Sequence, residues 1–283
     1  MYRAKLCLGL SDQFKLPFDE QIRLFHRVGF EGFFVDWAES LDVAALRRVA
    51  EEDGMIFQSI HAPFEKMADM WEPTEATAAA LDELIRCLHD CKDNGVPIMV
   101  AHAFIGFEKH TPTDFGLKNF EKVISAAEEL GVKVAFENTE GEEYLAALME
   151  HFKGSSAVGF CWDTGHEMCY NRSKDMLALY GNKLLCTHLN DNLGIRDYEG
   201  TITWIDDLHM LPFDGIADWQ GIAQRLNRHG FNEILTFELN TLSKPGRHEN
   251  DPYDRMKPED YITAAYIRAC RVAALKLSEK AAY

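Results

Sequence analysis

The sequence predicts a single (β/α)8 barrel, and three features of the chain support this fold class. Short β-rich runs alternate with longer amphipathic stretches from one end to the other, as in βα units around a parallel sheet. Eight such units fit into 283 residues, close to the roughly 31 residues per unit of a closed barrel. No linker or repeat divides the chain, so one domain is expected over residues 1–283. A doubly wound parallel sheet is the alternative fold.

Eight segments rich in apolar and β-branched residues are expected to form the strands. In chain order they are Lys5 to Leu10, Gly32 to Val35, Ile56 to Ile60, Ile98 to Ala101, Val132 to Phe136, Val158 to Trp162, Leu184 to Thr187 and Ile234 to Phe237. The expected helices include Phe18 to Val28, Thr74 to Asn94, Asp114 to Leu130, Glu142 to Phe152 and Trp219 to His229. Several are followed by a glycine that can end a helix, namely Gly29, Gly95, Gly131 and Gly230.

The composition excludes several classes of partner. Asp and Glu number 46 against 29 Lys and Arg, which gives a net charge of −17. A duplex-binding protein needs a basic face, so nucleic acid is not expected as a partner. An acidic surface also avoids anionic lipid, and no apolar run reaches the roughly 18 residues of a membrane helix. The first residues lack a signal-peptide profile, so the protein is expected in the cytoplasm.

The seven cysteines lie mostly in apolar runs, which is typical of reduced thiols rather than of a disulfide framework. Cys87 and Cys91 share a predicted helix at a spacing that can bind metal. We expect them to pack in the core, because no second Cys or His pair at zinc-finger spacing accompanies them.

Ionisable residues follow the predicted strands at the point where each one ends. In a (β/α)8 barrel the carboxyl ends of the strands line one mouth, where catalytic residues lie. Seven of the eight strands end in Asp, Glu or His, namely Asp36, His61, His102, Glu137, Asp163, His188 and Glu238. Asp and Glu number 46 and His 11 among 283 residues, so a chance run of seven is improbable. The alternative is that polar residues simply begin where strands end.

Four of these residues come from the fifth to eighth strands and are expected to converge: Glu137, Asp163, His188 and Glu238. Three carboxylates and one imidazole suit Mn²⁺, Co²⁺, Mg²⁺ or Zn²⁺. Acids buried together without a cation would repel one another, and a divalent ion removes that cost. The sequence therefore predicts one divalent metal ion at the mouth.

The local sequences around these positions resemble those of the xylose isomerase-like barrel superfamily, in order and over essentially the whole chain. The matching motifs are SIHAPF around His61, VAHAF around His102, AFENTEGEE from Ala135 to Glu143, WDTGH from Trp162 to His166, HLND from His188 to Asp191, DLHMLPFDG from Asp207 to Gly215 and FEL from Phe237 to Leu239. The superfamily includes sugar isomerases and epimerases, inosose dehydratases and endonuclease IV. The resemblance implies a metal-dependent enzyme that acts on a small carbohydrate.

Keto-sugar 3-epimerases of this superfamily hold one Mn²⁺-type ion, and two glutamate ligands also exchange the substrate proton. The resemblance implies Mn²⁺ as the first choice of ion, with Glu137 and Glu238 as catalytic residues among the four ligands. It also implies supporting or substrate-contacting roles for Glu143 and His166. From their places at strand ends or in the mouth loops, further substrate contacts are expected from Asp36, His61, His102, Arg196, Asp207 and His209. The alternatives are an orienting role for His166 and a solvated loop pair for Asp207 and His209. The family's arginine six residues beyond the metal histidine is replaced by Gly194, and Arg196 is the nearest substitute.

The expected chemistry passes through an enediolate. A cation that chelates a hydroxy-carbonyl makes the neighbouring C–H acidic. Two glutamates on opposite sides would invert the carbon, whereas one acting alone would move the proton between adjacent carbons and isomerise the sugar. The same enolate could expel a hydroxyl, so a lyase or dehydratase acting on a keto-sugar or inosose stays an alternative.

Endonuclease IV offers a different alternative, a three-zinc phosphodiesterase. All nine positions of its zinc ligands have matches, namely His61, His102, Glu137, Asp163, His166, His188, Asp207, His209 and Glu238. The acidic loops around the mouth disfavour a polyanionic substrate. A barrel that only binds sugar is the least expected class.

Two long connections, residues 189–217 and 240–257, follow the last two strands. Loops of that length usually form or cover a site. The second carries Lys244, Gly246, Arg247 and His248, which could bind phosphate. No glycine-rich nest accompanies them, so an unphosphorylated sugar or polyol is preferred. The loop could also contact a second subunit, which leaves a homo-oligomer open.

Overall fold

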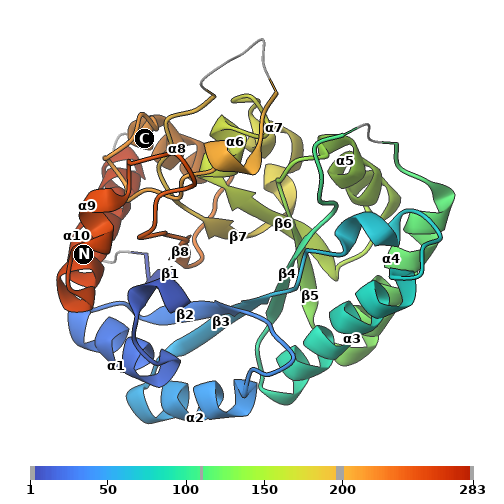
Figure 1. Ribbon diagram of the computed structural model, residues 1–283, viewed down its shortest axis with the longest axis horizontal. Coiled ribbons are helices and arrows are strands. Elements are labelled where there is room, and N and C mark those ends of the chain that lie inside the picture. The colour runs from blue at the N-terminus through green and yellow to red at the C-terminus, as the bar shows by residue number, and fades with distance from the viewer. Residues whose placement is uncertain (1–3, 109–110, 196–200, 281–283) are drawn as a thin grey trace.

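Eight parallel strands form a nearly closed barrel inside a ring of helices in the computed structural model, which describes residues 4–108, 111–195 and 201–280 (Figure 1). The strands are β1 (Leu6–Gly9), β2 (Gly32–Asp36), β3 (Ile56–His61), β4 (Ile98–His102), β5 (Lys133–Glu137), β6 (Val158–Asp163), β7 (Leu184–His188) and β8 (Leu235–Phe237). From β1 to β7 each strand pairs with the next, and β8 pairs with β1. The predicted (β/α)8 fold is confirmed, and each strand begins and ends within one residue of its predicted bounds.

The barrel closes just beyond the end of β7. The N–H of Leu189 donates to the carbonyl of Thr236 (2.8 Å), and the N–H of Glu238 donates to the carbonyl of Leu189 (3.3 Å). The hydroxyl of Thr187 adds hydrogen bonds to both backbone groups of Thr236. These bonds join the carboxyl ends of the two strands, and so they bring the side chains of His188 and Glu238 together.

The long helices pack outside the strands: α1 (Phe18–Val28), α2 (Val43–Asp53), α3 (Thr77–Asp93), α4 (Asp114–Leu130), α5 (Glu142–His151), α8 (Trp219–Arg228) and α10 (Pro258–Lys280). Shorter elements lie in the connections: η1 (Asp12–Phe14), η2 (Met67–Met70), α6 (Thr164–Met168), α7 (Met176–Tyr180), η3 (Gly181–Lys183), η4 (Trp204–Asp206) and α9 (Asp251–Asp254). The five predicted helices are confirmed within three residues. Helices α1 and α4 end at Gly29 (φ 119°) and Gly131 (φ 70°), a left-handed conformation that favours glycine.

The apolar core has two parts. The larger part lies between the strands and the helices, and a smaller cluster inside the barrel contains Val100, Ala135, Cys161 and Cys186. All seven cysteines are free thiols, and Cys87 and Cys91 are buried on α3 as predicted. Among the helices of the described residues, none combines the length and the apolar composition needed to cross a bilayer.

Candidate functional site

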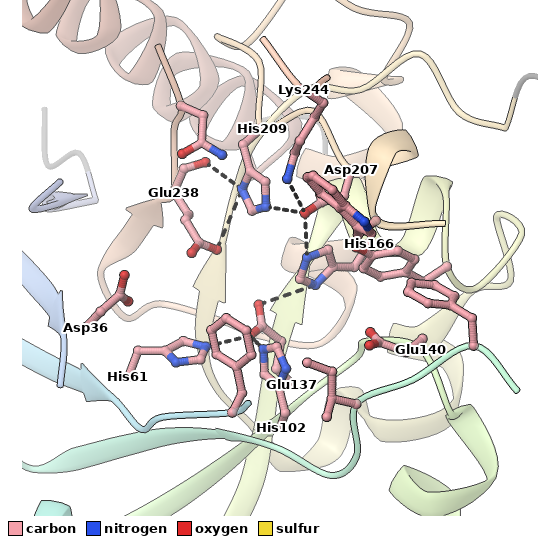
Figure 2. Close-up of a pocket in the computed structure, with 16 residues that line it drawn as sticks. Asp36, His61, His102, Glu137, Glu140, His166, Asp207, His209, Glu238 and Lys244 are labelled. Atoms are coloured by element: carbon pink, nitrogen blue, oxygen red, sulfur yellow. Dashed lines mark hydrogen bonds and ion pairs between the residues drawn. The ribbon is translucent and has the colours of Figure 1, made fainter. Parts of the chain in front are cut away.

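A pocket of about 440 Å³ opens at the carboxyl ends of the strands (Figure 2). Its lining consists of Asp36, His61, Phe64, His102, Ile105, Phe107, Glu137, Glu140, His166, Tyr170, Trp204, Asp207, His209, Glu238, Asn240 and Lys244. Strand ends supply the floor, and the connections after β3 to β8 supply the walls. We refer to it below as the principal pocket.

Glu137 occupies the centre of the floor, and imidazoles surround both of its oxygens. Its Oε1 lies 2.8 Å from Nδ1 of His188 and 3.6 Å from Nδ1 of His166. Its Oε2 lies 3.2 Å from Nε2 of His61 and 3.3 Å from Nε2 of His102. The Glu137 side chain is only 1% exposed, so its charge is balanced by these neighbours and not by bulk water.

The four predicted metal ligands, Glu137 among them, lie close together at the ends of the strands. Each of Glu137, Asp163, His188 and Glu238 offers one donor atom, and these atoms all lie within 4.8 Å of one another. Oε2 of Glu238 is 3.1 Å from the same His188 nitrogen that faces Glu137. Three oxygens and one nitrogen in this arrangement fit a divalent ion such as Mn²⁺, Co²⁺, Mg²⁺ or Zn²⁺.

Asp163 is held in place by neighbouring backbone and amide groups. Its Oδ1 accepts from the N–H of His166 (2.6 Å), where it caps α6, and its Oδ2 accepts from the amide of Asn190 (2.7 Å). Both backbone groups of Asp163 bond to the side chain of Asn138 at 2.8 Å. Such supporting contacts fix the orientation of a ligand before the ion binds.

Two further groups of side chains that could hold a metal ion flank the first. One combines His61 and His102 with Glu137, and the other is formed by His166, Asp207 and His209. Glu137 belongs to two of these groups, one with Asp163, His188 and Glu238 and the other with His61 and His102. Its Oε1 faces His188, and its Oε2 faces His61 and His102. The polar residues at the strand ends thus converge on one another and form a single cluster at the mouth.

The group His166, Asp207 and His209 depends on the long connection after β7. Asp207 Oδ2 lies 2.8 Å from Nε2 of His209 and 3.5 Å from Nε2 of His166, and Lys244 Nζ lies 3.6 Å from it (Figure 2). Oδ1 of Asp207 and Nδ1 of His166 are buried and have no hydrogen-bond partner among the described residues. Buried polar atoms without partners usually signal a missing ligand or water.

The acids at the mouth retain their charge because imidazoles face them. Burial would raise the pKa of Glu238, yet His188 and His209 lower it to about 2. Glu137 responds in the same way, and its pKa falls well below the ordinary value. Asp163 differs, because burial outweighs the attraction of nearby imidazoles and raises its pKa to about 6.

The histidines respond in the opposite sense. Burial opposes protonation of His61, but Glu137 beside it raises its pKa to about 8. Asp207 likewise raises the pKa of His209 to about 9 against the effect of burial. For His102 burial dominates, and its pKa is lowered. The mouth therefore attracts positive charge, as a cation-binding site must.

A fourth group of donors, Glu137, Cys161 and His188, is less suited to a metal. Burial raises the pKa of the Cys161 thiol well above its ordinary value, and the neighbouring thiol of Cys186 adds to the shift. A metal ligand must be the thiolate. Cys161 therefore belongs to the neutral interior of the barrel beneath the site.

Most residues predicted to contact substrate line the principal pocket, namely Asp36, His61, His102, His166, Asp207 and His209. Glu143 does not, because it is exposed on α5 and lines a neighbouring hollow. Arg196 lies outside the described residues. Asp207 and His209 are each 6% exposed, so they form a buried pair.

The basic residues of the last long loop are already paired with acids. Arg247 is buried, and its guanidinium lies 2.7 Å from Glu249 and 3.7 Å from Asp206. Lys244 is the only Lys or Arg among the described residues that line the principal pocket, and it faces Asp207. These pairings favour an unphosphorylated ligand over a phosphate ester.

Sequence reasoning missed three residues of the pocket wall. Glu140 lies three residues beyond Glu137, and its Oε1 accepts the N–H of Gly106 (3.1 Å). Tyr170 follows His166 by four residues, and the two rings lie 4.9 Å apart. Trp204 lies in the connection after β7 and is 50% exposed. The four-residue spacing between His166 and Tyr170 was the available signal.

Comparisons with known proteins agree with this geometry. Residues 16–259 match the family model described as xylose isomerase-like TIM barrel. A curated relative, the uncharacterized protein y4fM of Sinorhizobium fredii (strain NBRC 101917 / NGR234), is 28% identical over 162 residues, which is 54% of this chain and 49% of that protein. The match therefore spans about half the length of this relative.

Solved structures share the fold at low sequence identity. An L-ribulose 3-epimerase has a TM-score of 0.73 and 16% identity, covering 98% of this chain and 96% of that one. The IolI protein with a bound zinc atom has a TM-score of 0.74 and 18% identity, covering 95% and 98%. The D-psicose 3-epimerase of Clostridium cellulolyticum H10 has a TM-score of 0.70 and 14% identity, covering 94% and 99%.

Proposed function

The chain belongs to the xylose isomerase-like TIM barrel family, and we propose that it is a divalent-metal-dependent isomerase or epimerase of a small keto-sugar or related polyol. The observation that carries this proposal is the position of two carboxylates around one imidazole. Glu137 and Glu238 lie 2.8 Å and 3.1 Å from the same nitrogen of His188, at the floor of the principal pocket. Glu137, Asp163, His188 and Glu238 would hold the ion.

The bound ion would supply Lewis acidity that makes the C–H beside a carbonyl acidic. Glu238 is 24% exposed to the pocket, so we assign it as the first base that removes the proton. Glu137, which faces the same nitrogen of His188, would return a proton to the opposite face and invert the carbon. His61, His102 and His166 would orient the hydroxyls of the sugar.

Metal removal together with isotope exchange tests this proposal. Chelator-treated protein should lose turnover and regain it with Mn²⁺, Co²⁺, Mg²⁺ or Zn²⁺, and in D₂O the product of a ketose, pentulose or inosose should carry deuterium on carbon. Product mass should otherwise be unchanged, whereas loss of water would identify a lyase. Full turnover after complete metal removal would refute the proposal.

The three adjoining ligand groups favour a second candidate, a multinuclear phosphodiesterase. Glu137 faces His61 and His102 with one oxygen and His188 with the other, which is the arrangement of a bridging carboxylate. Elemental analysis separates the candidates, because this one requires about three zinc ions per chain and cleavage at abasic sites in DNA. The net charge of −17 weighs against a nucleic acid substrate.

A further inference from the structure

A second hollow adjoins the principal pocket. The two share Phe107, Glu140 and Tyr170 in their linings. The second hollow has a volume of about 510 Å³, and both volumes fall in the range of ligand sites, roughly 300–1,000 Å³. The rings of Phe107 and Tyr170 pack against each other at the shared boundary, with their centroids 5.7 Å apart, so a ligand that occupies both hollows would pass along these rings.

The groups that line the second hollow suit hydroxyls. They are Phe107, Glu140, Gly141, Glu142, Glu143, Tyr170, Asn171, Arg172, Thr201 and Ile202. Among the described residues of this lining, three carboxylates stand against one guanidinium, which disfavours a phosphate or carboxylate group. Lys174 pairs with Glu142, and the remaining carboxylate oxygens can accept hydrogen bonds from several hydroxyls. The two aromatic rings offer apolar faces to the C–H groups of a sugar. Together these features match a pyranose ring.

The floor of the second hollow is fixed relative to the metal ligands. The Asn171 side chain is 4% exposed, accepts a hydrogen bond from Asn138 (2.9 Å), and donates one to the carbonyl of Thr139 (3.2 Å). Asn138 also holds both backbone groups of Asp163. A rigid connection of this kind sets the distance between two parts of one ligand and lowers the entropy lost on binding.

We propose that the second hollow is a subsite for a further glycosyl unit, so that the substrate is a keto-sugar that carries a glycosidic substituent. The reacting unit lies at the metal ligands, and the attached sugar packs between the Phe107 and Tyr170 rings and the carboxylates of the second hollow. This inference rests on the proposed function for the identity of the reacting unit.

Calorimetric titration of the Mn²⁺-loaded protein with D-fructose, isomaltulose and lactulose tests the subsite. Each disaccharide is fructose with one added sugar, so any stereochemical misfit of the fructose unit is common to all three. At least one disaccharide should bind ten or more times as tightly as D-fructose. Thr201→Trp, which fills the second hollow, should abolish this preference and leave D-fructose affinity within twofold. Thr263→Trp, on the exposed face of α10, is the matched control.

The proposal is overturned if both disaccharides bind no more tightly than D-fructose, or if neither binds at all. It is also overturned if Thr201→Trp leaves the preference intact. Metal-dependent exchange of a D-fructose C–H with solvent deuterium, measured on the same samples, reports on the proposed function separately. Exchange without a disaccharide preference would support the proposed isomerase function and refute the subsite. A preference without exchange would support the subsite and refute the proposed function.

Discussion

Two layers of side chains inside the barrel lie two residues apart on the strands and differ in charge. The last residues of the strands form the upper layer, which contains Glu137, Asp163 and His188. Two residues earlier on the same strands stand Ala135, Cys161 and Cys186, all at most 1% exposed. Successive side chains of a strand alternate between its two faces, so both sets point into the barrel.

The comparison shows where this fold accommodates charge. In the upper layer, imidazoles stabilise the charged forms of Glu137 and Glu238, although burial raises the pKa of Asp163. Loops contribute further charged partners, such as Asp207 and Lys244. In the lower layer, burial keeps the Cys161 thiol neutral, with no acid of its own layer beside it in the cluster. Residues at the strand ends can therefore be replaced to give a different activity, while the neutral layer beneath keeps the barrel packed.

Replacing Glu238 should have the largest effect on the upper layer. Glu238→Gln keeps the shape of the side chain and removes the base, so turnover should fall by about 10³-fold, within the range for general acid–base groups. Steady-state assay of deuterium exchange measures the loss, and thermal unfolding confirms the fold. Glu233→Gln, exposed just before β8 at the other end of the barrel, is the control. Undiminished exchange in Glu238→Gln would show that another residue is the base.

A charge introduced into the lower layer should lower the stability of the fold and not act directly on catalysis. Cys161→Asp puts a carboxylate beside Glu137 and Cys186, its register partners on β5 and β7. The free energy of unfolding should fall by about 3–5 kcal/mol, because the new charge is buried against the carboxylate of Glu137 in the same group of donors. Urea denaturation measures the change, with Cys161→Ala as the control at about 1 kcal/mol. Equal midpoints for the two variants would show that the lower layer tolerates charge.

The sequence was sufficient to predict the upper layer but not its detailed contacts. Short runs rich in apolar and β-branched residues located all eight strands, and the rule that parallel strands share their carboxyl ends placed Glu137, Asp163, His188 and Glu238 together. Which oxygen of Glu137 faces which imidazole depends on side-chain rotamers, and these follow from packing and not from local pattern. The sequence therefore predicted the site's composition better than its connectivity.

The second hollow had no local signal in the sequence. Phe107, Glu140 and Tyr170 come from three different connections, and only the closed barrel brings them to one boundary. The pocket to which Glu143 belongs was not predictable for the same reason, because at the start of α5 it lines the second hollow and not the principal pocket. Positions that depend on loop conformation are the ones that a pattern of strands and helices leaves open.

Binding of a divalent ion should stabilise the upper layer by a smaller amount. An ion at 100 times its Kd adds about 2.7 kcal/mol to the free energy of unfolding. For a chain of this size that should raise the melting temperature by about 5 °C. Differential scanning calorimetry with and without MnCl₂ measures the shift. His188→Ala should abolish it and His26→Ala, exposed on α1, should preserve it; an equal shift in both variants would place the ion elsewhere.

The smallest expected effect is a local one, a change in the loop that carries Asp207 and His209 without a change in the strand that carries Glu137. Asp207 and His209 lie in the connection after β7, and the backbone of His209 is left-handed (φ 47°), which is uncommon for a residue other than glycine. Asp191 holds this connection. Its carboxylate is fully buried and accepts from the N–H groups of Phe213 (2.8 Å) and Ala217 (2.9 Å).

Asp191→Asn would turn an NH₂ group toward some of these donors, which should cost about 2 kcal/mol of stability. Hydrogen exchange of the amides from 207 to 213 should accelerate, while exchange in β5 should stay unchanged, because Glu137 is held by strand pairing and not by the loop. Asp218→Asn is the matched control, since Asp218 is exposed and asparagine caps α8 equally well. Equal acceleration in β5 would contradict this expectation. It would mean that the loop with Asp207 and His209 and the strand with Glu137 open together as one cooperative unit.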